Sequence, residues 1–248
     1  MKPKIMIIAG GLATRMKPIT ETIPKCLVDI AGKPLIQHQL EFFRGKGYTR
    51  FVFCVAHLAQ QVQDYFKDGS ALGVQVEYSR EPEVLLGTAG AAKVAEPLIT
   101  DDLCIIYYGD SLTTMDFDRL LAFHSDNQGD FTIVLRDNPP GYEGTSLITM
   151  NAQNEINEFI EKPSAEKREQ LRDEKKYINN GIYVMSRKVF DSIPANTKYD
   201  FAKQVIPGLL DKKARVLGYV SNDFFREIGR IEKYEKFAEE IKSKGSVL

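Results

Sequence analysis

The sequence predicts an α/β fold in which a mixed, mainly parallel sheet is flanked by helices. Apolar runs alternate with amphipathic stretches through the first half of the chain, as in units that place a helix between two parallel strands. The first apolar run ends in a pair of glycines, which allow a sharp turn from a strand toward a helix. With 248 residues, 43% of them hydrophobic, the chain is long enough to bury a sizeable core.

The first half shows the clearest alternation. We expect strands over residues 4–9, 51–55, 74–78 and 103–108, and helices over residues 34–45, 57–67 and 88–96. This order is typical of a nucleotide-binding half of Rossmann type, where ligands bind beyond the carboxyl ends of the strands. The loops that follow the first and fourth of these strands should therefore face the same ligand.

The second half is more mixed. We expect strands over residues 131–136, 146–150, 156–161 and 177–185, a turn at 151–154, a charged solvent-exposed helix over 166–175 and a charged amphipathic helix over 231–244. We find no internal repeat, low-complexity stretch or linker. The whole chain, residues 1–248, is therefore predicted to form a single domain.

Composition excludes several classes of protein. The 33 basic and 34 acidic residues give a net charge of −1, which argues against a general nucleic-acid or membrane-surface binder. No apolar run approaches the ~20 residues of a membrane span, and the first residues do not resemble a signal peptide. Cys26, Cys54 and Cys104 suit reduced thiols in a cytoplasmic protein better than disulfides or a zinc site.

Several aromatic residues and histidines are given structural roles. The histidines show no metal-ligand spacing and are expected to be structural or exposed: His38, His57 and His124. Four aromatic side chains are expected to belong to the core rather than to stack on a ligand: Phe42, Phe43, Tyr107 and Tyr108.

The loop after the first expected strand carries phosphate-binding chemistry. Gly10 and Gly11 let the backbone approach a ligand, and successive N–H groups in such a turn form an anion-binding concavity. Thr14, Arg15 and Lys17 add a hydroxyl and two cations. The loop matches neither the Walker A pattern nor G-x-G-x-x-G. We expect it to bind the phosphates of a nucleotide; the alternative is a turn that needs glycine only for its geometry.

This loop opens a longer pattern. Arg15 and Thr20 belong to it, and Pro24 and Lys25 follow at fixed spacing. The stretch resembles the signature of sugar-1-phosphate nucleotidylyltransferases, G-G-x-G-T-R-L/M-x-P-x-T followed by P-K-x-L/M. Further matches cover nearly the whole chain. The resemblance implies a nucleotidyltransferase fold and an enzyme that transfers a nucleoside monophosphate from a triphosphate to a sugar 1-phosphate.

Many relatives carry a C-terminal β-helix, which we do not expect here. Ala13 stands at a family glycine and should be tolerated unless its φ is positive.

Nucleotidyl transfer requires in-line positioning and neutralisation of growing negative charge. Mg²⁺ suits this task, because it prefers oxygen ligands from one or two carboxylates and from phosphates. Asp110 follows the strand at 103–108 and resembles the family's first metal ligand; an N-cap or turn role is the alternative. Glu227 stands where the family's second metal-binding Asp is expected, with a surface role as the alternative. Around it Phe225 replaces Trp, and Arg230 and Ile231 replace Thr-Pro.

The resemblance assigns the remaining site residues. Arg15 is expected to stabilise the leaving pyrophosphate and Lys25 to contact phosphate, so both are expected to be catalytic. The residues expected to bind the nucleotide are Gly10, Gly11, Leu12, Ala13, Thr14, Arg15, Lys25, Leu86, Gly87, Thr88 and Asp110. Those expected to bind the sugar phosphate are Gly144, Glu161, Lys162, Asn180 and Gly181. Taken alone, the E-K-P run around Lys162 could equally be a solvated charged turn.

The segment L-L-G-T-A-G-A at residues 85–91 is the expected base-specificity segment. It is similar to that of guanylyltransferases for mannose 1-phosphate or heptose 1-phosphate, which favours GTP. Glu81 or Glu83 could accept the N1–H and N2–H donors of guanine, or be plain loop residues. A uridylyl- or thymidylyltransferase and a non-catalytic sugar-nucleotide-binding relative are the alternatives. The sugar is not identified, and a homodimer is left open.

Overall fold

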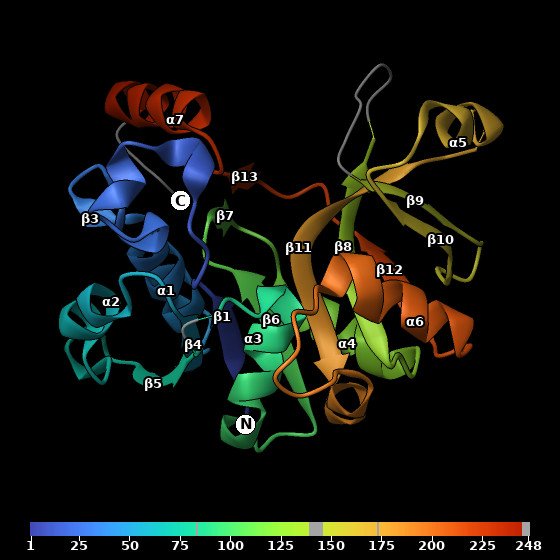
Figure 1. The fold of residues 1–248 in the computed structure, drawn as a ribbon, viewed down its shortest axis with the longest axis horizontal. Helices are drawn as coiled ribbons and strands as arrows, with labels where there is room; N and C mark the ends of the chain where they lie inside the picture. Colours follow the sequence, from blue (N-terminus) through green and yellow to red (C-terminus); the bar gives the residue numbers. More distant parts are fainter. Residues whose placement is uncertain (83, 139–145, 173, 245–248) are drawn as a thin grey trace.

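One large sheet organises the chain (Figure 1). The computed structural model describes residues 1–82, 84–138, 146–172 and 174–244. Within these residues nine strands join in the order β10-β9-β11-β6-β1-β4-β5, with β8 beside β11 and β12 beside β8. Their bounds are β1 Ile5–Ile8, β4 Arg50–Val55, β5 Gln75–Arg80, β6 Leu103–Tyr108, β8 Phe131–Asp137, β9 Ser146–Met150, β10 Ile156–Glu161, β11 Tyr177–Ser186 and β12 Val216–Val220.

The first half forms the expected parallel part of the sheet. Strand β1 lies between β4 and β6 and is parallel to both, and β5 is parallel to β4. Helices α1 (Leu35–Gly45), α2 (Ala59–Phe66) and α3 (Gly87–Ala95) connect these strands. Because the strands run in one direction, the segments after β1 and β6 meet at the same edge of the sheet. The α/β class and the order of the first-half elements are confirmed.

The second half adds antiparallel strands and elements that the sequence analysis did not assign. Strand β11 runs antiparallel to β6 and β8, with an irregular register between Asn179 and Tyr183. Helices α4 (Phe117–Asp126) and α6 (Ile206–Asp211), and strand β12, were not predicted. The helix expected over residues 166–175 is too long, because α5 covers only Ala165–Gln170. The chain leaves the helix at Leu171, whose side chain is buried.

Two small ribbons lie outside the large sheet. One pairs β2 (Asp29–Ile30) with β3 (Lys33–Pro34), and the other pairs β7 (Ser111–Thr113) with β13 (Phe225–Glu227). Helix α7 (Ile231–Lys244) follows β13 and packs Phe237 and Ile241 in a small core with Met16, Val28 and Ile228. The end of the described chain is thereby anchored against the loop that follows β1.

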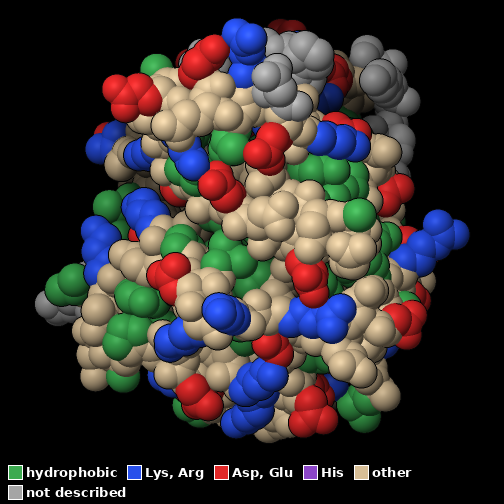
Figure 2. Space-filling view, turned by 90° about the vertical axis from the view of Figure 1, so that its right-hand side faces the viewer, with side chains coloured by type: hydrophobic (Ala, Val, Ile, Leu, Met, Phe, Trp, Pro, Cys, Tyr) green, Lys and Arg blue, Asp and Glu red, His purple; other side chains and the backbone are tan. Residues whose placement is uncertain are grey.

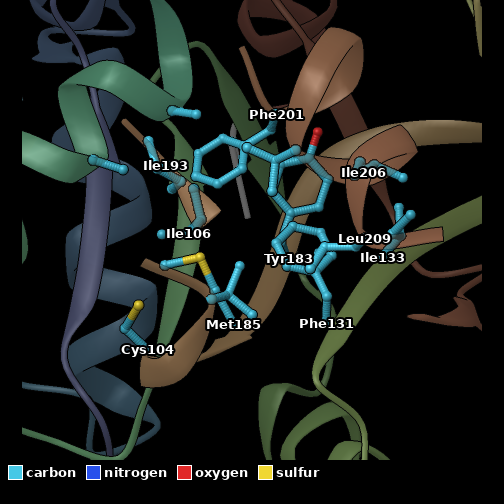
Figure 3. Packing of buried hydrophobic residues seen from close by; sticks show 14 of the residues in the cluster. Cys104, Ile106, Phe131, Ile133, Tyr183, Met185, Ile193, Phe201, Ile206 and Leu209 are labelled. Atoms are coloured by element: carbon cyan, nitrogen blue, oxygen red, sulfur yellow. The ribbon is translucent and has the colours of Figure 1, made fainter. Parts of the chain in front are cut away.

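Separate hydrophobic cores cover the two faces of the sheet. On one face, α3, α6 and the π-helical turn Phe201–Val205 pack around Tyr183 (Figure 3). The Tyr183 ring centroid lies 5.1 Å from that of Phe131 and 5.4 Å from that of Phe201. On the other face, α1, α2 and α4 cover the sheet. Phe43 and Tyr107 are fully buried there, which confirms their core assignment.

The surface shown in Figure 2 carries both signs of charge. Lysine and arginine side chains alternate there with aspartate and glutamate, and neither sign forms a continuous stripe on this face. All three cysteines are buried and unpaired. Among the described residues, no helix is both long and apolar enough to cross a membrane.

Phe43→Ala should destabilise the fold strongly. The Phe43 ring lies 4.8 Å from the centroid of Phe117 and 5.3 Å from that of Tyr107, so truncation leaves a cavity with no exposed side. We expect the free energy of unfolding to fall by about 3–5 kcal/mol in urea titrations. Phe42→Ala on the same helix is the control, because Phe42 is only half-buried. Equal losses in the two variants would contradict this account.

Burial of His124 should make stability depend on pH. Desolvation lowers the pKa of His124 to about 4 from its usual 6.5, despite the nearby Asp130 carboxylate. Between these values the unfolded chain binds a proton that the folded protein excludes. The free energy of unfolding should therefore fall as pH drops from 6.5 toward 4, by up to about 3 kcal/mol. His124→Gln should flatten this part of the profile, whereas His38→Gln should keep it.

Candidate active site

A cavity of about 730 Å³ opens beyond the carboxyl ends of β1 and β6. Its walls come from the loop after β1, the segment 108–111, β11, β13 and the start of α7. Ten of the expected site residues line it: Gly11, Ala13, Arg15, Lys25, Thr88, Asp110, Glu161, Asn180, Gly181 and Glu227. Such a volume is in the usual range for a small-molecule site. The structure therefore brings residues from both halves of the chain to one cavity.

The loop after β1 is held in a strained shape. Ala13 has φ 48° and ψ 41°, in the left-handed region that disfavours an alanine. The sequence analysis expected Ala13 to be tolerated only without positive φ, so its conformation is the unfavourable one. The carbonyl of Ala13 accepts hydrogen bonds from the Met16 N–H and the Thr20 hydroxyl, both at 2.9 Å. These two bonds hold the turn that carries the exposed Arg15 side chain into the cavity wall.

Lys25 and Asp110 meet in the centre of this wall. The Lys25 ammonium forms a close ion pair with the Asp110 carboxylate, and both side chains are mostly buried. Asp110 directly follows β6 and Gly109, as expected from the sequence. Its backbone carbonyl also accepts a hydrogen bond from the Ile228 N–H at 2.8 Å. Asp110 is therefore held by the first quarter of the chain through Lys25 and by the last through Ile228.

Glu227 reaches the same place from the other end of the chain. In the β7–β13 ribbon Glu227 pairs with Ser111, the residue after Asp110. One oxygen of Glu227 lies against Gly229 on the face that Lys25 also approaches, and the carboxylate forms a close ion pair with Lys233. The two carboxylates expected to hold a metal are thus neighbours.

This pair of carboxylates fits a particular kind of metal site. Among the described residues, no group of three or more His, Cys, Asp or Glu side chains is placed to hold a metal ion. A Mg²⁺ ion is nevertheless commonly bound by one or two carboxylates, with phosphate oxygens and water completing its coordination. Asp110 and Glu227 therefore suit an ion whose coordination is completed by water in the free protein and by phosphate oxygens when a substrate is bound.

The β11 side of the cavity offers polar groups for an uncharged ligand. Asn179 is used within the strand: its amide donates to the Tyr183 hydroxyl at 2.7 Å and accepts from the Gly181 N–H at 2.8 Å. Asn180 is 7% exposed, and its buried Oδ1 has no hydrogen-bond partner among the described residues. Burial raises the pKa of Glu161, although Lys162 and Lys203 partly oppose this shift. Asn180 and Glu161 could therefore accept hydrogen bonds from the hydroxyl groups of a ligand.

Gly181 adopts the positive φ of 70° that this turn of β11 requires. A Cβ at Gly181 would stand 2.9 Å from the Tyr108 ring, so glycine lets the strand pack closely on this side chain. Tyr108 lines the cavity. It is also half-buried and packs against the core around Tyr183, as expected.

The amino end of α3 is occupied by the chain itself. The Tyr199 carbonyl accepts hydrogen bonds from the N–H groups of Ala89 (2.9 Å) and Gly90 (3.0 Å). The Asp200 carboxylate accepts from the Thr88 N–H at 3.3 Å. The N–H groups at the start of α3, within the expected base-specificity segment, are therefore used internally, and the hydroxyl of Thr88 accepts a hydrogen bond from the Phe201 N–H.

Glu81 contacts both segments expected to bind the nucleotide, the loop after β1 and the segment at 85–91. Its side chain is 8% exposed, and one oxygen accepts a hydrogen bond from the Leu86 N–H at 2.8 Å. The other lies against Gly10, where a Cβ would stand 2.6 Å away. Burial raises the pKa of Glu81. Gly10 is thus needed for the close approach of this carboxylate to the loop after β1.

Some expected residues lie elsewhere. The six that are not part of the cavity wall are Gly10, Leu12, Thr14, Leu86, Gly87 and Lys162. Gly87 has φ 74° and packs on Asp200, so a side chain would not fit there. Lys162 is exposed and has φ 53°. Gly144 and Glu83 lie outside the described residues.

Other cavity residues were not predicted. Arg230 and Lys233 line the cavity and lie within the run compared with the family. Arg230 departs from the family's pattern and Lys233 stands at a position that the pattern leaves open, so neither was given a role. Arg136 and Ser146 also line the cavity, at positions that no sequence pattern singled out.

The chain is similar to known proteins over nearly its whole length. The nucleotidyl transferase family matches residues 4–244. A UTP–glucose-1-phosphate uridylyltransferase of Synechocystis is 33% identical over 243 residues, which cover 93% of this chain and 61% of that protein. A mannose-1-phosphate guanylyltransferase of Mycobacterium tuberculosis is 31% identical over 231 residues, or 92% and 62% of the two chains. The chain thus spans about three fifths of the length of these relatives.

A solved structure shares the fold. HddC from Yersinia pseudotuberculosis superposes with a TM-score of 0.80 at 24% identity, covering 97% of this chain and 100% of that one. This likeness shows that the fold of the chain is a known architecture.

Ala13→Gly should relieve backbone strain in the loop. Glycine adopts positive φ without the steric cost that alanine bears, which outweighs its greater entropy in the unfolded chain. We expect the free energy of unfolding to stay equal or rise by up to about 1 kcal/mol. Ala238→Gly in α7 is the control and should lose about 1 kcal/mol, because that residue lies within a regular helix. A clear loss of stability in Ala13→Gly would show that the turn is unstrained.

Proposed function

The chain belongs to the nucleotidyl transferase family, and from this premise we propose that it transfers a nucleoside monophosphate to a sugar 1-phosphate. The observation that carries the proposal is the meeting of Asp110 and Glu227 beside Lys25 in a cavity that Arg15 also lines. Two carboxylates and two cations next to a polar pocket suit a reaction between two phosphate-bearing substrates. A protein that only sensed sugar nucleotides would not need this concentration of charge.

In the proposed reaction an oxygen of the sugar phosphate attacks the α-phosphorus of the triphosphate. A new P–O bond forms, and the bond from the α-phosphorus to the bridging oxygen of pyrophosphate breaks, so that pyrophosphate leaves with the electron pair. Asp110 and Glu227 would hold a Mg²⁺ ion that neutralises phosphate charge. Lys25 would contact a phosphate oxygen, and Arg15 would stabilise the leaving pyrophosphate through its forked guanidinium.

The sugar would lie along β11. Asn180 offers a buried amide oxygen without a partner among the described residues, and Glu161 offers a half-buried carboxylate. Both accept hydrogen bonds, so both suit sugar hydroxyl groups. Lys162, on the exposed turn after Glu161, would meet the sugar phosphate. Together these groups supply orientation, which is the main catalytic need of this reaction.

GTP is the triphosphate that we propose. The carboxylate of Glu81 lies between the loop after β1 and the segment at 85–91, and in its ionised form it can only accept hydrogen bonds. Guanine presents two neighbouring donors, N1–H and N2–H, whereas uracil presents one. The relatives include both guanylyl- and uridylyltransferases, so a uridylyltransferase is the second candidate. The unpaired thiols and the nucleotide substrate suit a cytoplasmic enzyme.

A crossed substrate panel tests this function. Four nucleoside triphosphates are combined with a set of sugar 1-phosphates and Mg²⁺, with pyrophosphate release and the mass of the nucleotide sugar as readouts. We expect one combination containing GTP to dominate. A product formed from UTP or dTTP alone would overturn the base assignment, and release of no pyrophosphate from any pair would favour a non-catalytic role.

Arg15→Ala should impair turnover without loss of stability. The Arg15 side chain is exposed in the cavity wall, so its removal deletes a charge contact but no core packing. We expect kcat to fall on the order of 100-fold, as for other lost contacts to transition-state charge. Lys17→Ala is the matched control, because Lys17 is a cation on the same loop outside the cavity wall. If both variants turn over normally, Arg15 has no part in the mechanism.

Glu81→Gln should reduce the preference for GTP. The amide oxygen can still accept from the Leu86 N–H, but the second group can become a donor that opposes guanine. We expect the ratio of kcat/KM for GTP over UTP to fall about 10-fold or more. Glu96→Gln at the end of α3 is the control, since the Glu96 carboxylate pairs with Lys93 rather than with the segment at 85–91. An unchanged ratio would remove Glu81 from base recognition.

A further inference from the structure

Lys233 is the cationic partner of the second candidate metal ligand. It is the third residue of α7, and its ammonium forms a close ion pair with the Glu227 carboxylate. Both side chains line the cavity and remain partly exposed, at 45% for Lys233 and 35% for Glu227. The pair thus lies where a soluble cation can reach it.

Each of the two candidate metal ligands has an ammonium partner. Asp110 pairs with Lys25, and Glu227 pairs with Lys233. The remaining oxygen of Glu227 rests on Gly229, on the face that is also approached by Lys25, the partner of Asp110. A divalent cation between the two carboxylates would carry the positive charge that the lysines now supply. The cation and Lys233 would therefore compete for the same carboxylate.

We propose that Lys233 is a positioning residue that holds the Glu227 carboxylate in the cavity and is displaced from it by the divalent cation. The inference rests on the metal role of Asp110 and Glu227 in the proposed function. Lys233 would therefore oppose the binding of the metal ion but assist the binding of phosphate groups. The ion pair weakens metal binding to the free protein, and the displaced ammonium is left in the cavity wall, where it can contact the phosphates of the substrates.

The departure from the family's Asp at position 227 supports this reading. Glutamate is longer than aspartate by one methylene, about 1.3 Å along the chain. With that length Glu227 lies over Gly229 and still reaches Lys233 on the next helix. A residue with a Cβ at position 229 would collide with the Glu227 carboxylate. Gly229, Glu227 and Lys233 therefore form one arrangement, in which the lysine anchors the longer acid.

The expected size of the effect follows from the exposure of the pair. Partly exposed ion pairs stabilise by about 0.2–1 kcal/mol, and salt screens them. Loss of the competing lysine should therefore tighten divalent-cation binding to the free protein about twofold to fivefold. The difference should shrink as the salt concentration rises.

The test uses Mn²⁺ as a paramagnetic probe of the metal site in the full chain. The EPR signal of free Mn²⁺ gives its dissociation constant without any substrate, for the parent protein and for Lys233→Met. Lys236→Met is the matched control, since Lys236 is exposed on the same helix and outside the cavity wall. Lys233→Arg should behave as the parent, because a guanidinium can pair with Glu227. Circular dichroism confirms that each variant is folded.

Lys233→Met should bind Mn²⁺ about twofold to fivefold more tightly at low salt. In steady-state kinetics at saturating Mg²⁺ it should show a raised KM for a phosphate-bearing substrate. Unchanged or weaker Mn²⁺ binding by Lys233→Met would overturn the inference. Asp110→Asn separates this outcome from failure of the proposed function. If Asp110→Asn weakens Mn²⁺ binding while Lys233→Met does not change it, the role proposed for Lys233 is wrong but the metal site stands. If Asp110→Asn has no effect, the metal site itself is wrong.

Discussion

The pairing of β7 with β13 is the contact on which the candidate active site depends. It joins Ser111 to Glu227, and the adjoining hydrogen bond from the Ile228 N–H to the Asp110 carbonyl extends it by one residue. Two backbone connections thus bring together carboxylates that are more than a hundred residues apart in the chain. The small core of α7 stabilises the ribbon from behind by packing Phe237 and Ile241 against Met16. Without this ribbon Glu227 would have no fixed position relative to Asp110.

The two candidate metal ligands are paired with cations before any ligand arrives. Asp110 and Glu227 are each neutralised by a lysine, and the buried Glu81 is held by a backbone N–H instead. A buried or crowded carboxylate without such a partner would cost several kcal/mol. A cationic ligand that binds Asp110 and Glu227 must therefore replace the lysine ammonium groups that stabilise the free protein. In the proposed function, stability and metal affinity would therefore be linked through the same two lysines.

Much of the parallel half could be predicted, because alternating apolar runs report directly on buried strands. The Gly10–Arg15 loop, Asp110 and Glu227 were found from their positions after strands or within a family pattern, and the resemblance that named the family is confirmed. The positive φ of Ala13 could not be predicted, since it depends on bonds from Met16 and Thr20. The hydrogen bonds from the first N–H groups of α3 to Tyr199 and Asp200 could not be predicted either, because contacts between segments far apart in the chain leave no local sequence pattern. Assignment of the whole chain to one domain, and the roles of the individual site residues, stay predictions.

The late position of β13 in the chain has a consequence for synthesis. Domains form progressively as the polypeptide leaves the ribosome, amino end first. Strands β1, β4, β5 and β6 and the loop after β1 are all made before residue 110, so the parallel part of the sheet can begin to assemble early. Residues 225–241 supply both the second carboxylate and three of the eight buried residues in the small core around Met16. A nascent chain would thus display a nucleotide-binding half long before it acquired a complete reactive centre.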